Sequence, residues 1–373
     1  MNPEPFHDPA AAALMARAIE LARRGLYSTD PNPRVGCVIV QEGRIVGEGW
    51  HQRAGEAHAE VIALREAGGA ARGADVYVSL EPCSHHGKTP PCSEALIQAG
   101  VRRVIAALED PNPRVAGSGL RQLREAGIET ACGLLGHEAE ALNLGFCRRM
   151  RTGRPWIRSK LAMSLDGRTA MASGESRWIT GPEARRDVHG WRARSSAIVT
   201  GIDTLLADDP LMTARLDEPE TDIEQPVRVI LDSCLRCPSH PRMASAPGRT
   251  VILTTVAAPR QVPAGFEIVT LPPAASGRLD LGRVIDWLGQ QEFNEVLFEA
   301  GPTLNGALLA ENRVDEWIVY LAPVVLGDGG RGLFHLPQLT RMADRIGLQL
   351  VDQRRVGGDL RLSLSTSHSG PAN

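Results

Sequence analysis

Four residues in the first hundred positions have side chains that could hold and use a metal ion. His58 and Glu60 stand in "AGEAHAE", and Cys83 and Cys92 stand in "EPCSHHGKTPPC". Thiolate and imidazole groups are the ligands that zinc prefers, in a tetrahedral set of about four. Three protein ligands leave the fourth position to water, which is typical of a catalytic site. We therefore expect about one zinc ion per chain, held by His58, Cys83 and Cys92.

Glu60 has the chemistry of a general acid and base beside such a metal. A carboxylate that is not a ligand can take a proton from the activated water and deliver it to a leaving amine. In a regular helix, residues two apart point to opposite sides. His58 and Glu60 can therefore share a site only if His58 lies at or before the first turn of the helix that follows.

A structural zinc site and a site without metal are the alternatives. The shell of a structural site would be closed by a fourth ligand, which could be Cys37, His85 or His86. The local settings favour the open site. Cys83 follows a proline at a predicted strand end, and Cys92 follows two prolines at a predicted helix start, where free backbone N–H groups stabilise a thiolate.

The segments around these residues predict an α/β domain. Apolar spacing predicts a helix over residues 11–25, and two β-rich runs at 35–40 and 44–51 predict a hairpin. Strands and helices then alternate, and a helix over 138–151 closes the block. This order implies a largely parallel sheet flanked by helices. The expected helices are 58–68, 91–100 and 117–127, and the expected strands are 74–80, 102–108 and 128–135.

A second α/β pattern begins after "TGRP" at 152–155, so we expect two domains, 1–151 and 152–373. Residues 346–367 alternate as a terminal hairpin does, and 215–226 are acidic and turn-rich, as in an exposed loop. The expected strands of this domain are 156–163, 196–201, 226–233, 250–255, 295–300 and 316–326, and its helices are 182–194, 281–291 and 302–312.

Composition excludes several classes of protein. A net charge of −3 gives no bulk attraction to nucleic acid or to an anionic membrane. No apolar run approaches the ~18 residues that span a bilayer, and the N-terminus does not have the pattern of a signal peptide. Seven cysteines are too few for a secreted disulfide scaffold. We expect reduced thiols in a cytoplasmic protein, and we also expect a homo-oligomer whose number of subunits is left open.

His-x-Glu followed by Pro-Cys and a second Cys resembles the zinc-dependent nucleoside and nucleobase deaminases. Eight residues separate Cys83 from Cys92 here, instead of the usual two. This longer loop, with "NPRVGCVIV" upstream and "DPNPRVAG" downstream, resembles the bifunctional deaminase–reductases of the riboflavin pathway. The resemblance covers nearly the whole chain.

For the first domain, the resemblance implies a cytidine-deaminase-like, three-layer fold. The substrate would be 2,5-diamino-6-(5-phosphoribosylamino)pyrimidin-4(3H)-one. Lysine and histidine suit its phosphate and exocyclic oxygens, and asparagine can form hydrogen bonds with a ring edge. By resemblance, the substrate pocket would be lined by Asn32, His51, His85, Lys88, Asp110 and Asn112.

The second domain contains no comparably strong motif. "LGDGGRG" at 326–332 matches a dinucleotide-binding glycine pattern, but no helix is predicted to follow, so we interpret it as a turn. In "EAGPTLNGALL", a strand leads through a glycine turn into a helix whose N-terminal N–H groups could hold phosphate. An ordinary strand–turn–helix fits the residues equally well.

The resemblance implies that this domain is a dihydrofolate-reductase-like NADPH-dependent reductase. The cofactor would be contacted by Ala162, Trp178, Thr204, Asp208, Ser233, Gly301, Pro302, Thr303, Leu304, Asn305, Gly306 and Ala307. The substrate would be held by Ser176, Arg192, Met212, Arg215 and Glu299, with Lys160 beside the reacting ribose. The arginine guanidinium suits a phosphate because it can donate two parallel hydrogen bonds.

A cysteine-pair site, a nucleic-acid-editing deaminase and a non-enzymatic zinc module are three further interpretations. Cys234 and Cys237 in "CLRC" are followed by "PSHP" rather than a helix, so we interpret them as idle thiols. A nucleic-acid-editing deaminase would need basic grooves and stacking aromatics, and only 4% of the chain is aromatic. A non-enzymatic zinc module would need a fourth protein ligand. The resemblance therefore implies a bifunctional α/β enzyme that acts on a small phosphorylated pyrimidine.

Overall fold

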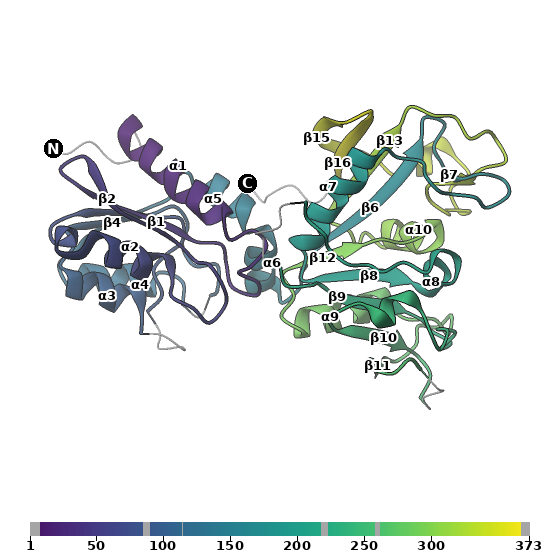
Figure 1. Cartoon of the computed structure of the whole chain (residues 1–373), viewed down its shortest axis with the longest axis horizontal. Coiled ribbons are helices and arrows are strands. Elements are labelled where there is room, and N and C mark those ends of the chain that lie inside the picture. The colour runs from purple at the N-terminus through teal and green to yellow at the C-terminus, as the bar shows by residue number, and fades with distance from the viewer. Residues whose placement is uncertain (1–7, 85–89, 114, 218–222, 258–261, 367–373) are drawn as a thin grey trace. The chain divides into compact units, whose positions relative to one another are not determined.

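The computed structural model describes residues 8–84, 90–113, 115–217, 223–257 and 262–366. The chain divides into two compact units, residues 1–153 and 154–373. Each unit is an α/β structure built around its own sheet (Figure 1). Between the two units, α6 ends at Thr152 and β6 begins at Trp156.

The sheet of the first unit has the strand order β2-β1-β3-β4-β5. β1 pairs antiparallel with β2 and β3, and β3, β4 and β5 pair in parallel. The predicted hairpin and the predicted parallel sheet are therefore confirmed. The strands are β1 (Gly36–Gln41), β2 (Arg44–Trp50), β3 (Asp75–Val78), β4 (Arg103–Ala106) and β5 (Glu129–Cys132).

Helices cover both faces of this sheet, which gives the expected three layers (Figure 1). Alternation along the strands turns Val38 and Tyr77 towards one face and Ile39 and Val76 towards the other. The first face is covered by α1 (Pro9–Arg23) and α5 (Gly136–Leu142), and the second by α2 (Ala59–Ala67), α3 (Cys92–Ala99) and α4 (Ser118–Glu125).

The predicted helix over 138–151 is wrong as a single element. Two helices, α5 and α6 (Leu144–Thr152), meet at Asn143, whose backbone leaves the helical region with φ of −118°. The buried Asn143 side chain accepts a hydrogen bond from Arg34 N and donates one to Arg34 O, both at 2.9 Å. These hydrogen bonds to a distant residue compete with the backbone hydrogen bonds of a continuous helix. A local sequence pattern cannot predict them.

The second unit contains a sheet of order β11-β10-β9-β8-β12-β6-β13-β16-β15. The strands from β11 to β13 in this order run parallel, and the antiparallel β15–β16 pair forms the predicted terminal hairpin. A separate antiparallel pair, β7 (Arg168–Ala170) with β14 (Arg331–Gly332), was not predicted. The strands of the large sheet are β6 (Trp156–Ser164), β8 (Ala197–Gly201), β9 (Val227–Leu231), β10 (Thr250–Thr254), β11 (Phe266–Thr270), β12 (Glu295–Phe298), β13 (Glu316–Ala322), β15 (Leu348–Val356) and β16 (Asp359–Thr366).

Four helices pack on this sheet. α9 (Leu281–Gln290) and α10 (Pro302–Ala310) bury their apolar residues in the largest core cluster. α8 (Ile202–Asp208) packs with Ile198 and Ile230, and α7 (Pro182–Ala193) packs on Ile318 and Tyr320. Helix α8 and the edge strand β11 were not predicted from the sequence. Ligands bind at the carboxyl ends of parallel strands in such sheets, and both α8 and α10 begin at those ends.

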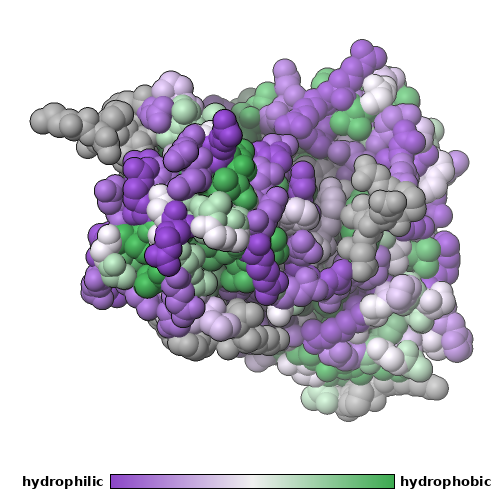
Figure 2. Space-filling model, turned by 60° about the vertical axis from the view of Figure 1, so that its left-hand side comes forward, coloured by the Kyte–Doolittle hydropathy of each residue, from purple (hydrophilic) through white to green (hydrophobic). Residues whose placement is uncertain are grey.

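The described residues include no helix that is long and apolar enough to cross a membrane. Figure 2 shows hydrophilic side chains over most of one face, interrupted by small apolar patches.

Candidate active sites

Three elements place the candidate zinc ligands of the first unit. His58 is the N-cap of α2 with an extended backbone, φ −74° and ψ 163°. The condition for sharing a site with Glu60 is therefore met, because His58 lies before the first turn. Cys83 follows the end of β3, and Cys92 opens α3 with its backbone N–H directed at Cys83 Sγ, 3.3 Å away.

The three ligand atoms are arranged as zinc requires. His58 Nδ1 lies 3.2 Å from Cys92 Sγ and 3.6 Å from Cys83 Sγ, and the three atoms lie within 4.8 Å of one another. Zinc bond lengths of about 2.0–2.3 Å in a tetrahedron separate ligand atoms by roughly 3.5–3.8 Å, so the residues fit the ion. In the part of the chain that the structure describes, no fourth His, Cys, Asp or Glu joins the group. Cys37 lies buried in β1, and His85 and His86 lie outside the described residues.

The surroundings of the metal-free site favour a thiolate at Cys83 and a thiol at Cys92. A hydrogen bond from Cys92, together with His58, lowers the pKa of Cys83 to about 4. The resulting negative charge raises the pKa of Cys92 in the metal-free protein. Glu60 is only 3% exposed. Burial, reinforced by the charge on Cys83, raises its pKa to about 7. A carboxyl group with that pKa can both take and return a proton near neutral pH.

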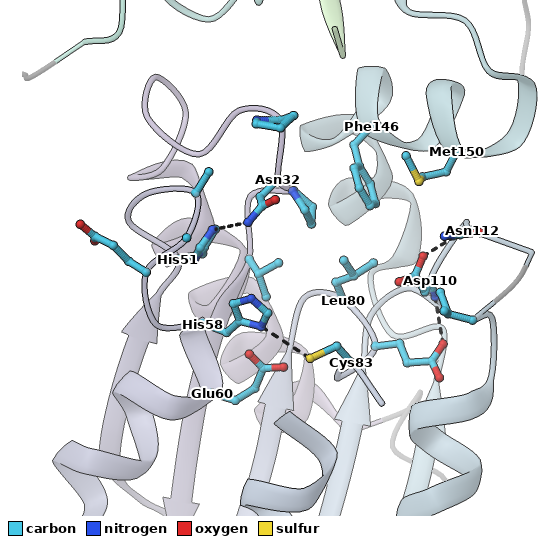
Figure 3. A pocket seen from close by; sticks show the side chains of 18 residues that line it. Asn32, His51, His58, Glu60, Leu80, Cys83, Asp110, Asn112, Phe146 and Met150 are labelled. Carbon is cyan, nitrogen blue, oxygen red and sulfur yellow. Dashed lines mark hydrogen bonds between the residues drawn. The ribbon is translucent and has the colours of Figure 1, made fainter. Parts of the chain in front are cut away.

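A cavity of about 500 Å³ opens over this cluster, and four of the predicted substrate residues line it: Asn32, His51, Asp110 and Asn112 (Figure 3). His51 Nδ1 lies 3.2 Å from Ala57 O, which can only accept, so the proton is on Nδ1. Its Nε2 then accepts from Asn32 Nδ2 at 3.0 Å. Burial lowers the pKa of His51 and favours this neutral form.

Among the other lining residues, which the sequence did not predict, three are important for the site. Phe146 and Met150 from α6 form an apolar wall of the cavity (Figure 3), and Glu81 lies two residues before Cys83 in the chain. The position of Glu81 at the end of a buried strand, directly before "PC", was a signal that could have been used. His85 and Lys88 lie outside the described residues.

The second unit has two adjoining cavities of about 590 Å³ each at the carboxyl ends of β6, β8 and β12. Both contain Lys160, Ala162, Ser176, Thr204, Asp208 and Glu299. The first also contains Gly301–Asn305 at the start of α10, and the second contains Trp178, Arg192, Met212 and Arg215. The structure thus brings most predicted reductase residues together.

Three predicted cofactor residues, Ser233, Gly306 and Ala307, do not line these two cavities. Ser233 and Ala307 line a neighbouring cavity of about 520 Å³, which shares Thr303 and Leu304 with the first. At Gly306, an added Cβ would come within 2.2 Å of His335 O. A glycine is needed there for close packing of α10 against the backbone of His335.

A half-buried ion pair between Arg192 and Glu299 organises the cationic side of the second unit's site. Arg192 donates to both carboxylate oxygens of Glu299 at 2.6 and 2.8 Å. Burial opposes ionisation of Glu299, but Arg192 and Lys160 outweigh it and lower the pKa to about 2. Burial lowers the pKa of Lys160, and Arg192 adds to this while Glu299 opposes it.

Sequence reasoning missed four basic residues of this site: Arg177, Arg185, His189 and Arg242. Arg185, His189 and Arg192 are spaced four and three residues apart on α7, a pattern that predicts a common helix face. Burial, with Arg192 and Arg215 nearby, lowers the pKa of His189 to about 4. The cavity lining holds six lysines and arginines against two carboxylates, so it suits an anionic ligand.

Two other segments have simple structures. Residues 326–330 form the predicted turn, and the last two residues of the predicted segment, Arg331 and Gly332, are instead β14. Cys234 and Cys237 lie in the loop after β9, where the Cys237 N–H donates to Asp232 at 2.8 Å and both thiols are free.

Known proteins match both units. A model of the cytidine and deoxycytidylate deaminase zinc-binding region matches residues 9–108, and a model of the RibD C-terminal domain matches residues 155–362. Together with the fold and the two sites, these matches define a bifunctional enzyme that joins a zinc-dependent deaminase to a reductase.

The chain is 54% identical to the riboflavin biosynthesis protein RibD of Escherichia coli K12 over 359 residues, which cover 94% of this chain and 98% of that protein. RibD of Acinetobacter baumannii has a TM-score of 0.89 at 45% identity, covering 96% of this chain and 99% of the other. A solved deaminase/reductase from Thermotoga maritima has a TM-score of 0.86 at 32% identity, covering 95% and 98%. The chain belongs to the RibD family and carries out the deaminase and reductase steps of riboflavin biosynthesis. His58, Cys83 and Cys92 are its zinc-binding site, and its reductase domain is of the NADPH-dependent kind.

Proposed function

We propose that the first domain hydrolyses an amino group from 2,5-diamino-6-(5-phosphoribosylamino)pyrimidin-4(3H)-one and that the second reduces the ribosyl side chain of the product to ribityl. The observation that carries this proposal is the buried Glu60 beside a three-ligand zinc site at the floor of a cavity. The proposed domains are 1–151 for the deaminase and 152–373 for the reductase.

In the deaminase, the chain supplies the proton transfer and the orientation of the ring. Zinc, when bound, activates a water molecule for attack on the ring. Glu60 takes the proton of that water and returns it to the leaving amine. The Asn32–His51 pair fixes the amide of Asn32 for a hydrogen bond to the pyrimidine edge.

In the reductase, NADPH supplies the hydride. The start of α10, with its free N–H groups, is the proposed place for cofactor phosphate, beside Thr204 and Asp208. Arg192, Arg215 and Lys160 are proposed to hold the phosphorylated substrate. Glu299 stays ionised and holds Arg192 in a fixed orientation through two hydrogen bonds.

The test is a coupled assay on the purified protein with the diaminopyrimidine as substrate. We expect ammonia release without NADPH, and oxidation of NADPH only after the deamination step. Release of ammonia without any later oxidation of NADPH would contradict the reductase proposal. Failure to release ammonia from zinc-loaded protein would contradict the deaminase proposal.

The domain assignment has its own test. Residues 154–373 expressed alone should bind NADPH, and residues 1–153 should not, because each unit has its own sheet and core. Cofactor binding by the folded first unit would contradict the assignment.

We also propose that the protein acts in the cytoplasm as a homo-oligomer and that its partners are small molecules rather than nucleic acid or membrane. The seven free cysteines support a reducing compartment. Sedimentation of the purified protein would test the oligomeric state.

A further inference from the structure

Glu81 lies between β3 and the zinc ligand Cys83, and its carboxylate is almost completely buried, with 5% of the residue exposed. Four backbone N–H groups donate to it. Asp110 N and Gly117 N donate to Oε2 at 3.0 and 2.9 Å, and Gly119 N and Leu120 N donate to Oε1 at 2.8 and 3.1 Å. A buried carboxylate saturated in this way fixes every group that donates to it.

Three of these donors form the N-terminus of α4. Gly117 is its N-cap, and Gly119 and Leu120 are its second and third residues. The cap residue provides no side-chain hydrogen bond of its own. Glu81 therefore takes the part of a capping side chain from a different segment of the chain, where the positive end of the helix dipole also favours a carboxylate.

The packing leaves little freedom in this arrangement. A Cβ added to Gly119 would lie 1.9 Å from Pro82 O, so α4 begins directly against the peptide that leads to Cys83. Gly117 has φ of +71°, a backbone conformation that favours glycine. The start of α4 and the Glu81–Pro82 segment therefore move together.

The fourth donor, Asp110 N, connects the contact between Glu81 and the start of α4 to the substrate cavity. Asp110 accepts a hydrogen bond from Asn112 N at 2.8 Å, and both residues line the cavity above Cys83 (Figure 3). Glu81 thus joins the loop that carries a zinc ligand to the loop that carries two proposed substrate contacts.

We propose that Glu81 is a positioning residue of the deaminase, which sets Asp110 and Asn112 at the distance from the zinc ligands that the pyrimidine requires. This inference rests on the proposed function, because it takes Asp110 and Asn112 as substrate contacts. It assigns Glu81 no contact with the metal or with the reacting atoms. Loss of its carboxylate should weaken substrate binding and leave the zinc in place.

The test uses Glu81→Gln in the full-length, zinc-loaded protein. Glutamine matches the shape of glutamate, but its NH₂ group cannot accept, so two of the four N–H groups lose their partner. We expect zinc content and reductase rate to stay at the wild-type level and the KM for the diaminopyrimidine to rise by about tenfold or more, with a smaller change in kcat. Amide hydrogen exchange over residues 108–120 should become faster. Glu109 is an exposed acid in the same loop. Glu109→Gln is therefore the matched control and should change neither the KM for the diaminopyrimidine nor the amide exchange.

Two further variants show whether Glu81 acts through the loop. In Glu81→Gln/Asn112→Ala, the increase in KM should be smaller than the product of the two single effects, because the contact that Glu81 positions is already absent. Glu81→Asp, which keeps the charge on a shorter side chain, should recover part of the lost affinity.

Loss of zinc in Glu81→Gln, or wild-type KM and exchange, would overturn the proposal. If neither Glu81→Gln nor Glu81→Asp gives folded protein, Glu81 serves the fold and the proposal is also wrong. Failure of the wild type to deaminate the substrate would instead contradict the proposed function, and the exchange measurement would still decide whether Glu81 holds the loop.

Discussion

The two sites differ in how the chain supplies their chemistry. The deaminase site has its metal ligands and its proposed acid–base group within 35 residues, so a small set of side chains would perform the reaction. The reductase site collects residues from Lys160 to Leu333, and the proposed hydride donor is a cofactor. The chain contributes shape and charge to the second site and reactive groups to the first. Few residue types can replace a metal ligand or an acid–base group, whereas many combinations of residues can give a cavity the shape and charge that a ligand requires.

The first prediction concerns the deaminase site, where we expect the largest effect. Glu60→Gln should keep its zinc, because Glu60 is not a ligand, and should lose deaminase activity by about 10²–10⁴-fold, because the amide cannot take up the proton. Ammonia release and zinc content are the measurements. The same variant given the deaminated pyrimidine should oxidise NADPH at the wild-type rate. A zinc-loaded variant that releases ammonia normally would remove Glu60 from the mechanism.

The second prediction concerns the metal. Cys83→Ala should lose zinc and deamination together, because a site with two remaining ligands holds the ion weakly. Elemental analysis of the wild type should give about one zinc per chain. Cys234→Ser/Cys237→Ser is the control and should keep that zinc. Two tightly bound ions in the wild type would show that the loop after β9 is a second site.

The third prediction tests the charge of the reductase cavity. Arg215→Ala should raise the KM for the reductase substrate roughly tenfold, since a charge-assisted hydrogen bond contributes about 1.5 kcal/mol or more. The Kd for NADPH should stay nearly unchanged. Arg283→Ala on α9, also an exposed arginine of the second unit, is the matched control. An unchanged KM would place Arg215 outside the substrate site.

The smallest expected effect concerns pH. The folded protein holds the pKa of His189 at about 4, below its ordinary value of 6.5. As pH falls from about 6.5 to 4, the unfolded chain binds a proton that the folded chain refuses, so the free energy of unfolding decreases, by on the order of 1–3 kcal/mol. His189→Asn should make the stability of the second unit less dependent on pH in this range. Unfolding curves that change with pH as steeply as those of the wild type would contradict this.

The sequence predicted the first site better than the second for physical reasons. His58, Cys83 and Cys92 stand at element boundaries marked by proline and by changes of periodicity, so both their chemistry and their placement could be read locally. The hydrogen bonds that Glu81 accepts could not be predicted from the local sequence, because their donors lie 29 to 39 residues away. The break at Asn143 depends on Arg34, 109 residues earlier.

Most strands and helices followed from apolar periodicity. The exceptions were short or lay at edges: β7 and β14 have three and two residues, and β11 is an edge strand with a mixed burial pattern. In the reductase, Arg192 of α7 was predicted, but Arg185 and His189 were missed because each directly follows a core residue of the helix, Ala184 or Val188.

The excess of lysine and arginine around the second cavity also affects how fast its substrate arrives. Six cations against two carboxylates produce a positive potential that extends into solution and attracts a phosphorylated molecule before any contact forms. Dissolved ions shorten the reach of this potential to about 8 Å at physiological ionic strength. The association rate of the substrate with the reductase should therefore fall as salt is added. The capture of substrate at this site is set by the surrounding electrolyte as well as by the protein.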